Sequence, residues 1–446
     1  MSVAAQSQRS LPHVRLQRRS HLLVWLFSLV LVAACAEIVI DASVGHSALI
    51  PKSPAIAGWL SGAGERLGFR VFLIALLAAS AAYAGMLALT IRGRAAPLSK
   101  RGAIALVAVL HLVLFVGPVL LSTDVFSYIA YARMGVEHGL NPYLTGPSAI
   151  SSDPVFRFVG QDWRNTETAY GPLYTLISYP LAPLGVEGAL WGMKVEALLA
   201  SAGTLALTWR CARLRKMDPV AALLLVGANP LYVLYGVGGA HNDLIMMLLM
   251  MLAVALTLGE PRSSLREGQA AAAVIAGALV KATVAVLLPF MILSRRRLAP
   301  IAGALVALGV GALIGYAVFG IHGIDLVAAL NRDAAFVSTD SFANEIAHLF
   351  GKPGVFPADH DLLKGALVAT VLYLLWRTWR GYDWVAASGW ALLAISVTST
   401  WLLAWYILWP LPLAVVSRDR RLLAATLAVQ SLFVIHQMAP LISPTS

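Results

Sequence analysis

Long uninterrupted runs of apolar residues dominate this sequence and restrict the folds open to it. Runs near the length of about twenty residues that crosses a bilayer as a helix lie at 22–40, 68–91, 102–121, 187–209, 219–238, 299–319, 385–400 and 422–440. Shorter candidates lie at 172–185, 244–258, 363–376 and 402–416, and 269–293 is either one span or a hairpin broken near Lys281. Because lipid offers no hydrogen bonds to the backbone, spanning segments must be helical. The sequence predicts an all-α polytopic integral membrane protein with about eleven to thirteen transmembrane or re-entrant helices.

Composition agrees with this class. Of 446 residues, 59% are hydrophobic and only 12% are charged, which is more apolar than a soluble domain tolerates. The two cysteines, Cys35 and Cys211, fall near opposite membrane faces, so no disulfide framework is predicted. Without internal repeats or a soluble appendage, residues 1–446 are expected to form one membrane domain that begins with a basic cytoplasmic tail at 1–20.

Basic clusters predict the orientation in the membrane. They precede the first span (Arg9 to Arg19), follow the second (Arg92 to Arg101), and recur at 210–216, 295–297 and 418–421. Placing all five inside satisfies the positive-inside rule and accounts for the net charge of +11 without a nucleic-acid partner. The large loops 122–170 and 320–362 then face the periplasm or the exterior of an inner (plasma) membrane. This orientation requires 172–185 to dip in without crossing and 269–293 to return to its starting side.

Asp124 is the most informative single residue, because it opens the first outer loop where the apolar run 102–121 ends. A carboxylate at that position can simply cap a helix. It can also act as a general base, since a hydroxyl nucleophile needs a group that accepts its proton as the new bond forms. The loop that follows is expected to carry one or two short interfacial helices, beginning with 126–138.

A second polar group, His241-Asn242-Asp243, emerges on the same outer side after a Gly-rich turn. Asp243 can be read as the N-cap of the next helix. Together the three side chains could instead orient Asp124, bind sugar hydroxyls or ligate a divalent ion. A metal site would need more ligands than one His and one Asp, so no metal is predicted and no cofactor is required.

Lys281 lies deep in an apolar stretch, where charge is costly and indicates function, although the side chain could also snorkel to the interface. At the tip of a hairpin it could neutralise a phosphate. Arg133, Arg164 and Arg332 of the outer loops are rival phosphate ligands. The loop residues Tyr128 and Asn141 are expected to bind substrate, and the rings of Tyr143, Trp163 and Tyr170 to stack on a sugar.

Several patterns occur in a fixed order: STDVFSY at 122–128, GLNPY at 139–143, DWR at 162–164, YGPL at 170–173 and GAHND at 239–243. In this order they resemble the polyprenol-phosphate-mannose-dependent α-(1→6)-mannosyltransferases of actinobacterial type, within the glycosyltransferase C superfamily. The resemblance implies that the first large outer loop carries the catalytic Asp, here Asp124. It also implies a polyprenyl-phosphate sugar donor, inversion at the anomeric carbon, and an active-site lining that includes His241 and Asp243.

The function predicted from all of this is inverting transfer of a hexose, most simply mannose, from a polyprenyl-phosphate donor to a glycan or glycolipid hydroxyl. Walker A, His-Glu-x-x-His and Gly-x-Ser-x-Gly patterns are absent from the sequence, which excludes the simplest nucleotide hydrolase, zinc protease and serine hydrolase readings. A secondary transporter or a flippase of a lipid-linked sugar is the alternative. Transporters of that kind usually show internal two-fold repetition, which this sequence lacks.

Overall fold

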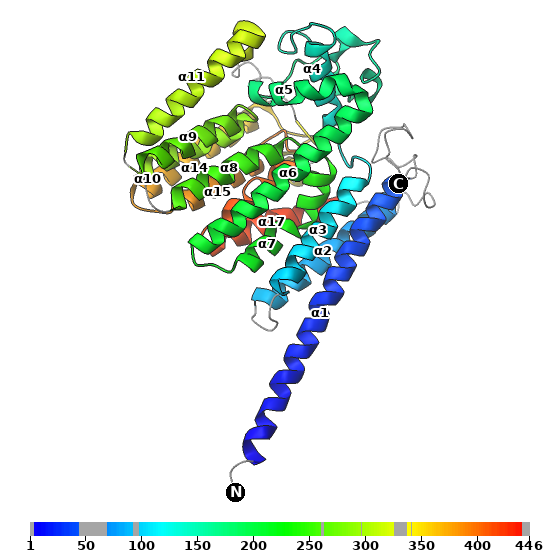
Figure 1. Cartoon of the computed structure of the whole chain (residues 1–446), viewed down its shortest axis with the longest axis vertical. Helices are drawn as coiled ribbons and strands as arrows, with labels where there is room; N and C mark the ends of the chain where they lie inside the picture. Colours follow the sequence, from blue (N-terminus) through cyan, green and yellow to red (C-terminus); the bar gives the residue numbers. More distant parts are fainter. Residues whose placement is uncertain are drawn as a thin grey trace.

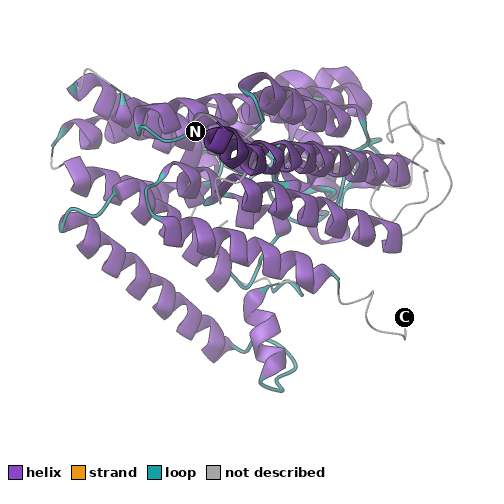
Figure 2. Cartoon of the chain, turned by 90° about the horizontal axis from the view of Figure 1, so that it is seen from below, coloured by secondary structure: helices purple, strands orange, loops and turns teal. Residues whose placement is uncertain are grey.

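The computed structural model of the chain describes residues 4–43, 69–91, 98–259, 263–295, 297–324, 337–339 and 341–438. Within these ranges every regular element is helical (Figures 1 and 2), which confirms the all-α class. The first half of the chain contains α1 (Ala4–Ser43), α2 (Phe69–Ile91), α3 (Lys100–Val116), α4 (Asp124–Val136), α5 (Pro172–Ser178), α6 (Gly185–Leu214) and α7 (Pro219–Gly227). The second half contains α8 (Asp243–Leu258), α9 (Ser264–Ala278), α10 (Leu287–Arg295), α11 (Ala299–Phe319), α13 (Phe342–Leu349), α14 (Pro357–Trp379), α15 (Trp384–Thr398), α16 (Leu411–Val416) and α17 (Arg420–Gln437).

Membrane-spanning character is carried by long and by broken helices. Among the described residues, four stretches are long and apolar enough to cross a bilayer: Leu22–Ser43, Phe69–Leu89, Pro172–Leu214 and Ala299–His322. A fifth is the pair formed by α7 and the π-helix η6 (Tyr232–Gly238), which are bent by 65°. Shorter apolar helices cover Asp243–Leu258, Ala282–Arg295, Trp384–Thr398 and Ala404–Val416. On α11, Leu305, Val306 and Leu313 are each more than 60% exposed, as expected of side chains that face lipid.

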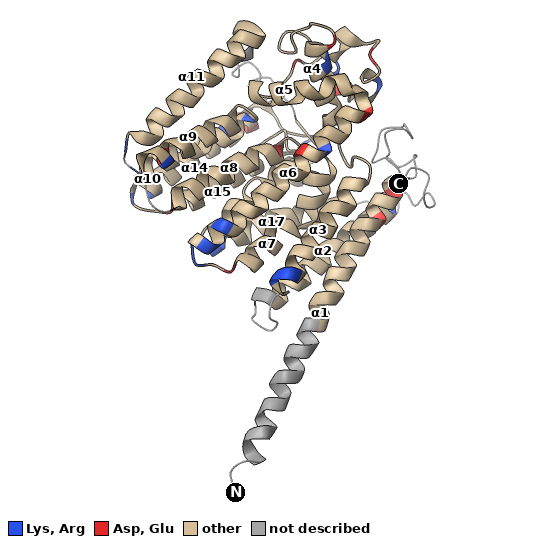
Figure 3. Ribbon diagram, viewed as in Figure 1, with Lys and Arg blue, Asp and Glu red and all other residues tan. Residues whose placement is uncertain are grey.

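The basic clusters gather at one end of the helix bundle, toward the lower left of Figure 3. We call it the basic end; its described members are Lys100, Arg101, Arg210, Arg213, Arg215, Lys216, Arg295, Arg297, Arg418, Arg420 and Arg421. Arg418 donates to the Arg215 carbonyl (3.0 Å), joining two clusters that are far apart in the sequence. The opposite end carries α4 and residues 117–170, and we call it the loop end.

Helices that start at the basic end begin with polar caps, because their first amide groups face the aqueous side. Ser99, Asp218, Ser263, Asp383 and Asp419 accept hydrogen bonds from amides of the first turns of α3, α7, α9, α15 and α17, respectively. Local sequence therefore fixes where five chain segments enter the bundle.

The structure bears on two topological expectations. α5 and the 3₁₀-helix η5 (Tyr179–Leu184) pack on α4 at the loop end, and the expectation that 172–185 does not cross stays a prediction. α9 runs toward the loop end, the chain turns at Lys281, and η7 (Ala282–Val286) with α10 returns. The pair Arg297–Glu267 (3.5 Å) shows that both arms meet at the basic end.

Two expectations need correction. The apolar run 102–121 is not one helix, because Gly117-Pro118 ends α3 and residues 117–123 are irregular. The helix expected to lie at the interface is α4, but nearly all of its side chains are buried. After α4 the loop holds three short 3₁₀-helices, η2 (Pro147–Ile150), η3 (Phe156–Phe158) and η4 (Gln161–Trp163). In the second loop, Arg332 lies outside the described residues.

Candidate functional site

Asp124 is placed by the irregular segment that follows α3. Leu121 has a positive φ of 65°, a conformation that L-residues other than Asn and Asp rarely adopt. This turn directs the chain into α4, of which Asp124 is the first residue and Thr123 the N-cap. The Asp124 amide donates to Ser122 Oγ (3.1 Å), and the residue is only 7% exposed. The carboxylate is thus a buried group at a helix start, not the capping residue.

The backbone just before His241 also adopts an unusual conformation. Ala240 has a φ of 52°, and it follows the π-helix η6, a form frequent at functional sites. A Cβ on Gly239 would lie 2.5 Å from the Tyr235 carbonyl, so this turn requires glycine. The Leu120 amide donates to the Gly238 carbonyl (3.0 Å) and ties the two segments together. Strained backbone therefore flanks both halves of the site, as is common where side chains are held for function.

The structure brings Asp124 and the 241–243 corner together. His241 Nδ1 lies 3.9 Å from Asp124 Oδ2. The Tyr128 hydroxyl, one turn along α4, lies 3.4 Å from both His241 Nδ1 and Asn242 Oδ1. His241, Asn242 and Asp243 are all buried. Four of the predicted site residues and Asp124 thus form one polar cluster in an apolar protein.

Lys281 completes this cluster from the tip of the α9–α10 hairpin. Its Nζ donates to Asp243 Oδ1 (2.8 Å) and lies 4.4 Å from the centre of the Tyr406 ring. The Gly171 amide donates to the Val280 carbonyl (3.1 Å), which pins the hairpin tip to the start of α5. Lys281 therefore points into the site and does not snorkel toward the basic end.

Asp243 receives two donors on one oxygen. Besides Lys281, the Trp409 indole N–H donates to Asp243 Oδ1 (2.6 Å). The second oxygen, Oδ2, is buried and makes no hydrogen bond within the protein, as is also true of Asn242 Nδ2 and His241 Nε2. Buried polar atoms are normally paired. These three atoms offer an acceptor, a donor and a group of either kind, which suits a polyhydroxylated ligand.

Burial sets the protonation states of the cluster. Burial raises the pKa of Asp124 to about 6; Asp243 acts in the same direction, while Lys281 and the bond with Ser122 oppose it. Burial, reinforced by Lys281, holds the pKa of His241 well below its usual range, so this imidazole is neutral. Burial also raises the pKa of Tyr128 well above its usual range. A pKa of about 6 suits Asp124 to the role of a general base near neutral pH.

Tyr170 lies beside this cluster, because its ring packs edge-on against Tyr128 with centroids 4.8 Å apart. Trp163 lies at the rim and packs edge-on against Trp401 (6.1 Å). Tyr143 donates to the Tyr170 carbonyl (2.9 Å) and so supports the loop from behind. Stacking of these rings on a sugar stays a prediction.

Three other predicted ligands point elsewhere. Arg133 holds Asp153 through both carboxylate oxygens and donates to the Ala182 carbonyl, at the far end of α4. Arg164 donates to the Val159 carbonyl. Asn141 donates to the Phe319 carbonyl (2.7 Å). Burial raises the pKa of Asp153, but the hydrogen bonds from Arg133, His138 and the Val155 amide outweigh it and hold the pKa at about 2. Arg133 and Arg164 thus stabilise the loop in this structure, and a phosphate role for either stays a prediction.

Sequence reasoning missed the contribution of the segment 401–409. Trp405, Tyr406 and Trp409 are not among the residues predicted for the site, yet Trp405 stacks on His241 with ring centroids 3.7 Å apart. The available signal was the spacing of Trp401, Trp405 and Trp409 at intervals of four. Next to this segment lies a cavity of about 470 Å³ bordered by Leu121, Ser338 and Trp405. Among the described residues, no three of His, Cys, Asp and Glu converge as metal ligands.

Comparison with known proteins adds family information to this geometry. The family model described as alpha-(1->6)-mannopyranosyltransferase, N-terminal domain, matches residues 26–297, and that of glycosyltransferase family 87 matches residues 168–444. Alpha-(1->6)-mannopyranosyltransferase A of Mycobacterium tuberculosis is 27% identical over 349 residues, 70% of this chain and 66% of the relative. Its namesake in Corynebacterium glutamicum is 31% identical over 183 residues, 40% and 36% of the two chains. Alpha-(1->6)-mannopyranosyltransferase B of C. glutamicum is 27% identical over 155 residues, 32% and 25%. The matched part thus spans between a quarter and two thirds of these relatives.

Proposed function

The chain belongs to the alpha-(1->6)-mannopyranosyltransferase family and to glycosyltransferase family 87, and from this premise we propose that it transfers mannose from a polyprenyl-phosphate donor to a hydroxyl of a glycan or glycolipid. The observation that carries the proposal is the buried cluster at the loop end, in which Asp124 lies 3.9 Å from His241 and Lys281 is paired with Asp243. One acid, one ammonium group and several unpaired polar atoms are what such a transfer requires.

Asp124 is the proposed base. In a single displacement, the acceptor oxygen forms a bond to the anomeric carbon while its proton passes to the Asp124 carboxylate. The bond between the anomeric carbon and the phosphate oxygen breaks, and polyprenyl phosphate leaves with the electron pair, so configuration inverts. With a pKa of about 6, Asp124 is mostly ionised at neutral pH and still basic enough to accept the proton.

Lys281 is the proposed partner of the leaving phosphate. An ammonium group has three N–H donors, and the structure uses one of them on Asp243. The side chain of Lys281 is 15% exposed, compared with 3% for that of Asp243, so its remaining donors can reach a ligand. A fixed positive charge beside the leaving oxygen stabilises the negative charge that develops there.

The position of the site in the membrane supports a lipid-linked donor. Asp124 is the first residue of α4, which lies at the loop end, opposite the basic end (Figure 3), and by the positive-inside rule the basic end would face the cytoplasm. The reaction would then occur on the periplasmic or outer face, where nucleotide sugars are not supplied. A donor on a polyprenyl chain reaches this face through the membrane. The acceptor is a glycan or glycolipid hydroxyl on the same face.

Transfer of labelled mannose from polyprenyl phosphate by the purified, full-length protein tests this proposal. We expect α-linked product from a β-linked donor with the wild-type protein. Asp124→Asn should lower kcat by at least about 100-fold, the lower range for loss of a general base. Asp162→Asn, an exposed acid of the same loop, is the matched control and should retain activity.

Two results would contradict the proposal. Substantial turnover by Asp124→Asn would remove the base from the mechanism. Movement of labelled lipid-linked sugar across liposomes, without transfer to any acceptor, would replace the transferase with a flippase.

A further inference from the structure

The segment 401–409 contributes aromatic side chains to the site from a distant part of the chain, and two of them, Trp405 and Trp409, contact His241 and Asp243. It contains the 3₁₀-helix η9 (Ala404–Leu408), which carries Trp405 and has Trp409 as its C-cap. Trp409 donates its indole N–H to Asp243 Oδ1 (2.6 Å), and the Trp405 ring lies flat on His241, at an interplanar angle of 24°. Both contacts are made to side chains, so they act directly on side-chain orientation.

Trp409 determines which Asp243 oxygen is free. An indole is a donor only, and Trp409 shares Oδ1 with Lys281. Two donors on one oxygen stop the carboxylate from rotating and leave Oδ2 without a partner in the protein. Hydrogen bonds to a charged group are stronger than those between neutral groups, so this orientation is strongly preferred.

Trp405 fixes the plane of His241 in the same way. With the Trp405 ring stacked on one face at 3.7 Å, the imidazole cannot turn out of plane. Its Nδ1 therefore stays 3.4 Å from the Tyr128 hydroxyl and 3.9 Å from Asp124 Oδ2. Trp405 is itself only 5% exposed, so the stacked pair is largely shielded from solvent.

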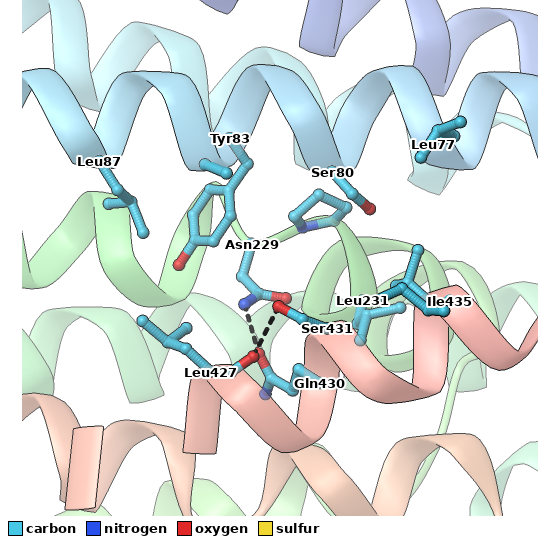
Figure 4. Close-up of a pocket in the computed structure, with 13 residues that line it drawn as sticks. Leu77, Ser80, Tyr83, Leu87, Asn229, Leu231, Leu427, Gln430, Ser431 and Ile435 are labelled. Atoms are coloured by element: carbon cyan, nitrogen blue, oxygen red, sulfur yellow. Dashed lines mark hydrogen bonds between the residues drawn. The ribbon is translucent and has the colours of Figure 1, made fainter. Parts of the chain in front are cut away.

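A polar contact behind η9 holds the two tryptophans in register. Gln430 of α17 donates to the Ile407 carbonyl (3.1 Å), between Trp405 and Trp409. The same side chain accepts from Asn229 Nδ2 (2.8 Å), at the bend between α7 and η6. Figure 4 shows this Asn229–Gln430 bond in the wall of a cavity of about 240 Å³. One polar pair thus links the helix that leads to His241 with the segment that carries the tryptophans.

We propose that Trp405 and Trp409 are positioning residues of the transfer reaction: Trp409 orients Asp243 so that Oδ2 accepts a hydrogen bond from a substrate hydroxyl, and Trp405 orients His241 toward Asp124. This inference rests on the proposed function, because the substrate hydroxyl belongs to the donor sugar or the acceptor. It assigns to the C-terminal part of the chain a direct share in the geometry of the site.

Kinetics of Trp409→Phe, Asp243→Asn and the double variant in the mannose-transfer assay test this inference. Trp409→Phe keeps the ring and removes the N–H donor. We expect kcat to fall about 10- to 100-fold, as for a lost hydrogen bond to a charged group, with little change in KM for the acceptor. If Trp409 acts through Asp243, the double variant should have the activity of Asp243→Asn alone. Multiplicative losses in the double variant would overturn the inference.

A matched control separates positioning from loss of structure. Trp390 donates its indole N–H to Asp419 Oδ2 (3.1 Å) at the basic end, and Trp390→Phe should leave kcat unchanged. Trp405→Phe should retain more activity than Trp405→Leu, because a ring can still stack on His241. Equal loss in these two, or a loss in Trp390→Phe as large as in Trp409→Phe, would contradict the assignment.

Thermal unfolding of the same variants tests the Trp409–Asp243 contact without any substrate. The Trp409–Asp243 bond requires the shifts in melting temperature of the two single variants to be non-additive in the double variant. Additive shifts would overturn the inference even if the wild-type protein transfers mannose. Failure of the wild-type protein to transfer mannose, with non-additive shifts, would overturn the proposed function and leave the contact itself supported.

Discussion

The Lys281–Asp243 pair allows a stability prediction with a magnitude taken from its burial. Their side chains are 15% and 3% exposed, and Lys281 Nζ lies 2.8 Å from Asp243 Oδ1. In Lys281→Met the Asp243 carboxylate keeps only the Trp409 indole as a donor. Removing one partner of a buried ion pair costs about 3–5 kcal/mol, because the remaining charge stays desolvated. We therefore expect Lys281→Met to lower the free energy of unfolding by that amount.

Removing both charges should recover most of the lost free energy of unfolding. Neutral groups of similar shape can replace a buried pair with little change in stability, so Lys281→Met combined with Asp243→Asn should be more stable than Lys281→Met alone. Asp243→Asn alone should cost less than Lys281→Met, since the more exposed ammonium group can recover water.

Reversible denaturant unfolding of the purified protein in detergent measures these differences. Lys352→Met is the control. The Lys352–Asp359 distance is 2.7 Å, close to the 2.8 Å of the Lys281–Asp243 pair, but the side chains of Lys352 and Asp359 are 42% and 26% exposed. Solvent screens such a pair, and we expect no measurable loss. The reasoning is refuted if Lys281→Met costs no more than Lys352→Met, or if the double variant loses the sum of the two single losses.

Two further predictions concern the acids of the first loop. Because the ionised form of Asp124 is the base and burial raises its pKa to about 6, log kcat/KM should fall by about one per pH unit below pH 6; a flat profile between pH 5 and 7 would contradict this. Asp153→Asn should destabilise the protein by about 3–5 kcal/mol, because it leaves Arg133, whose side chain is 14% exposed, without its carboxylate. Activity per folded molecule should be unchanged, and a selective loss of donor binding would restore Arg133 as a ligand.

The helical class, the position of Asp124 and the hairpin at Lys281 could all be predicted because each depends on local sequence. Apolar runs of bilayer length predict spans, and positive-inside asymmetry indicates which segments must return. A lysine in the middle of an apolar run marks the break in 269–293, and the structure places the turn there. Gly117-Pro118 also indicates the early end of α3. The apolar residues 118–121 nevertheless extend the hydrophobic run, so hydropathy alone predicts a longer helix.

Contacts between distant segments could not be predicted. Trp409 and Asp243 are 166 residues apart, and nothing in either local sequence specifies the packing that joins them. The partner of Arg133 could not be predicted for a similar reason. Its partner Asp153 lies twenty residues away in a loop of 3₁₀ turns, whose path hydropathy does not determine. An exposed arginine and a paired one look alike in sequence.

The arrangement of the site explains why its polar residues are stable in so apolar a protein. Asp124 and Asp243 are the first residues of α4 and α8, where the helix dipole favours negative charge. Lys281 supplies the compensating positive charge from a third segment, and Trp409 supplies an uncharged donor from a fourth. Asp243 is thus stabilised without being fully satisfied, because its Oδ2 makes no hydrogen bond within the described residues, while Asp124 lies 3.9 Å from a neutral imidazole. Full pairing would add stability but would leave no oxygen to accept a proton or a sugar hydroxyl. The incomplete hydrogen bonding of this cluster is therefore the feature that ties its structure to the proposed chemistry.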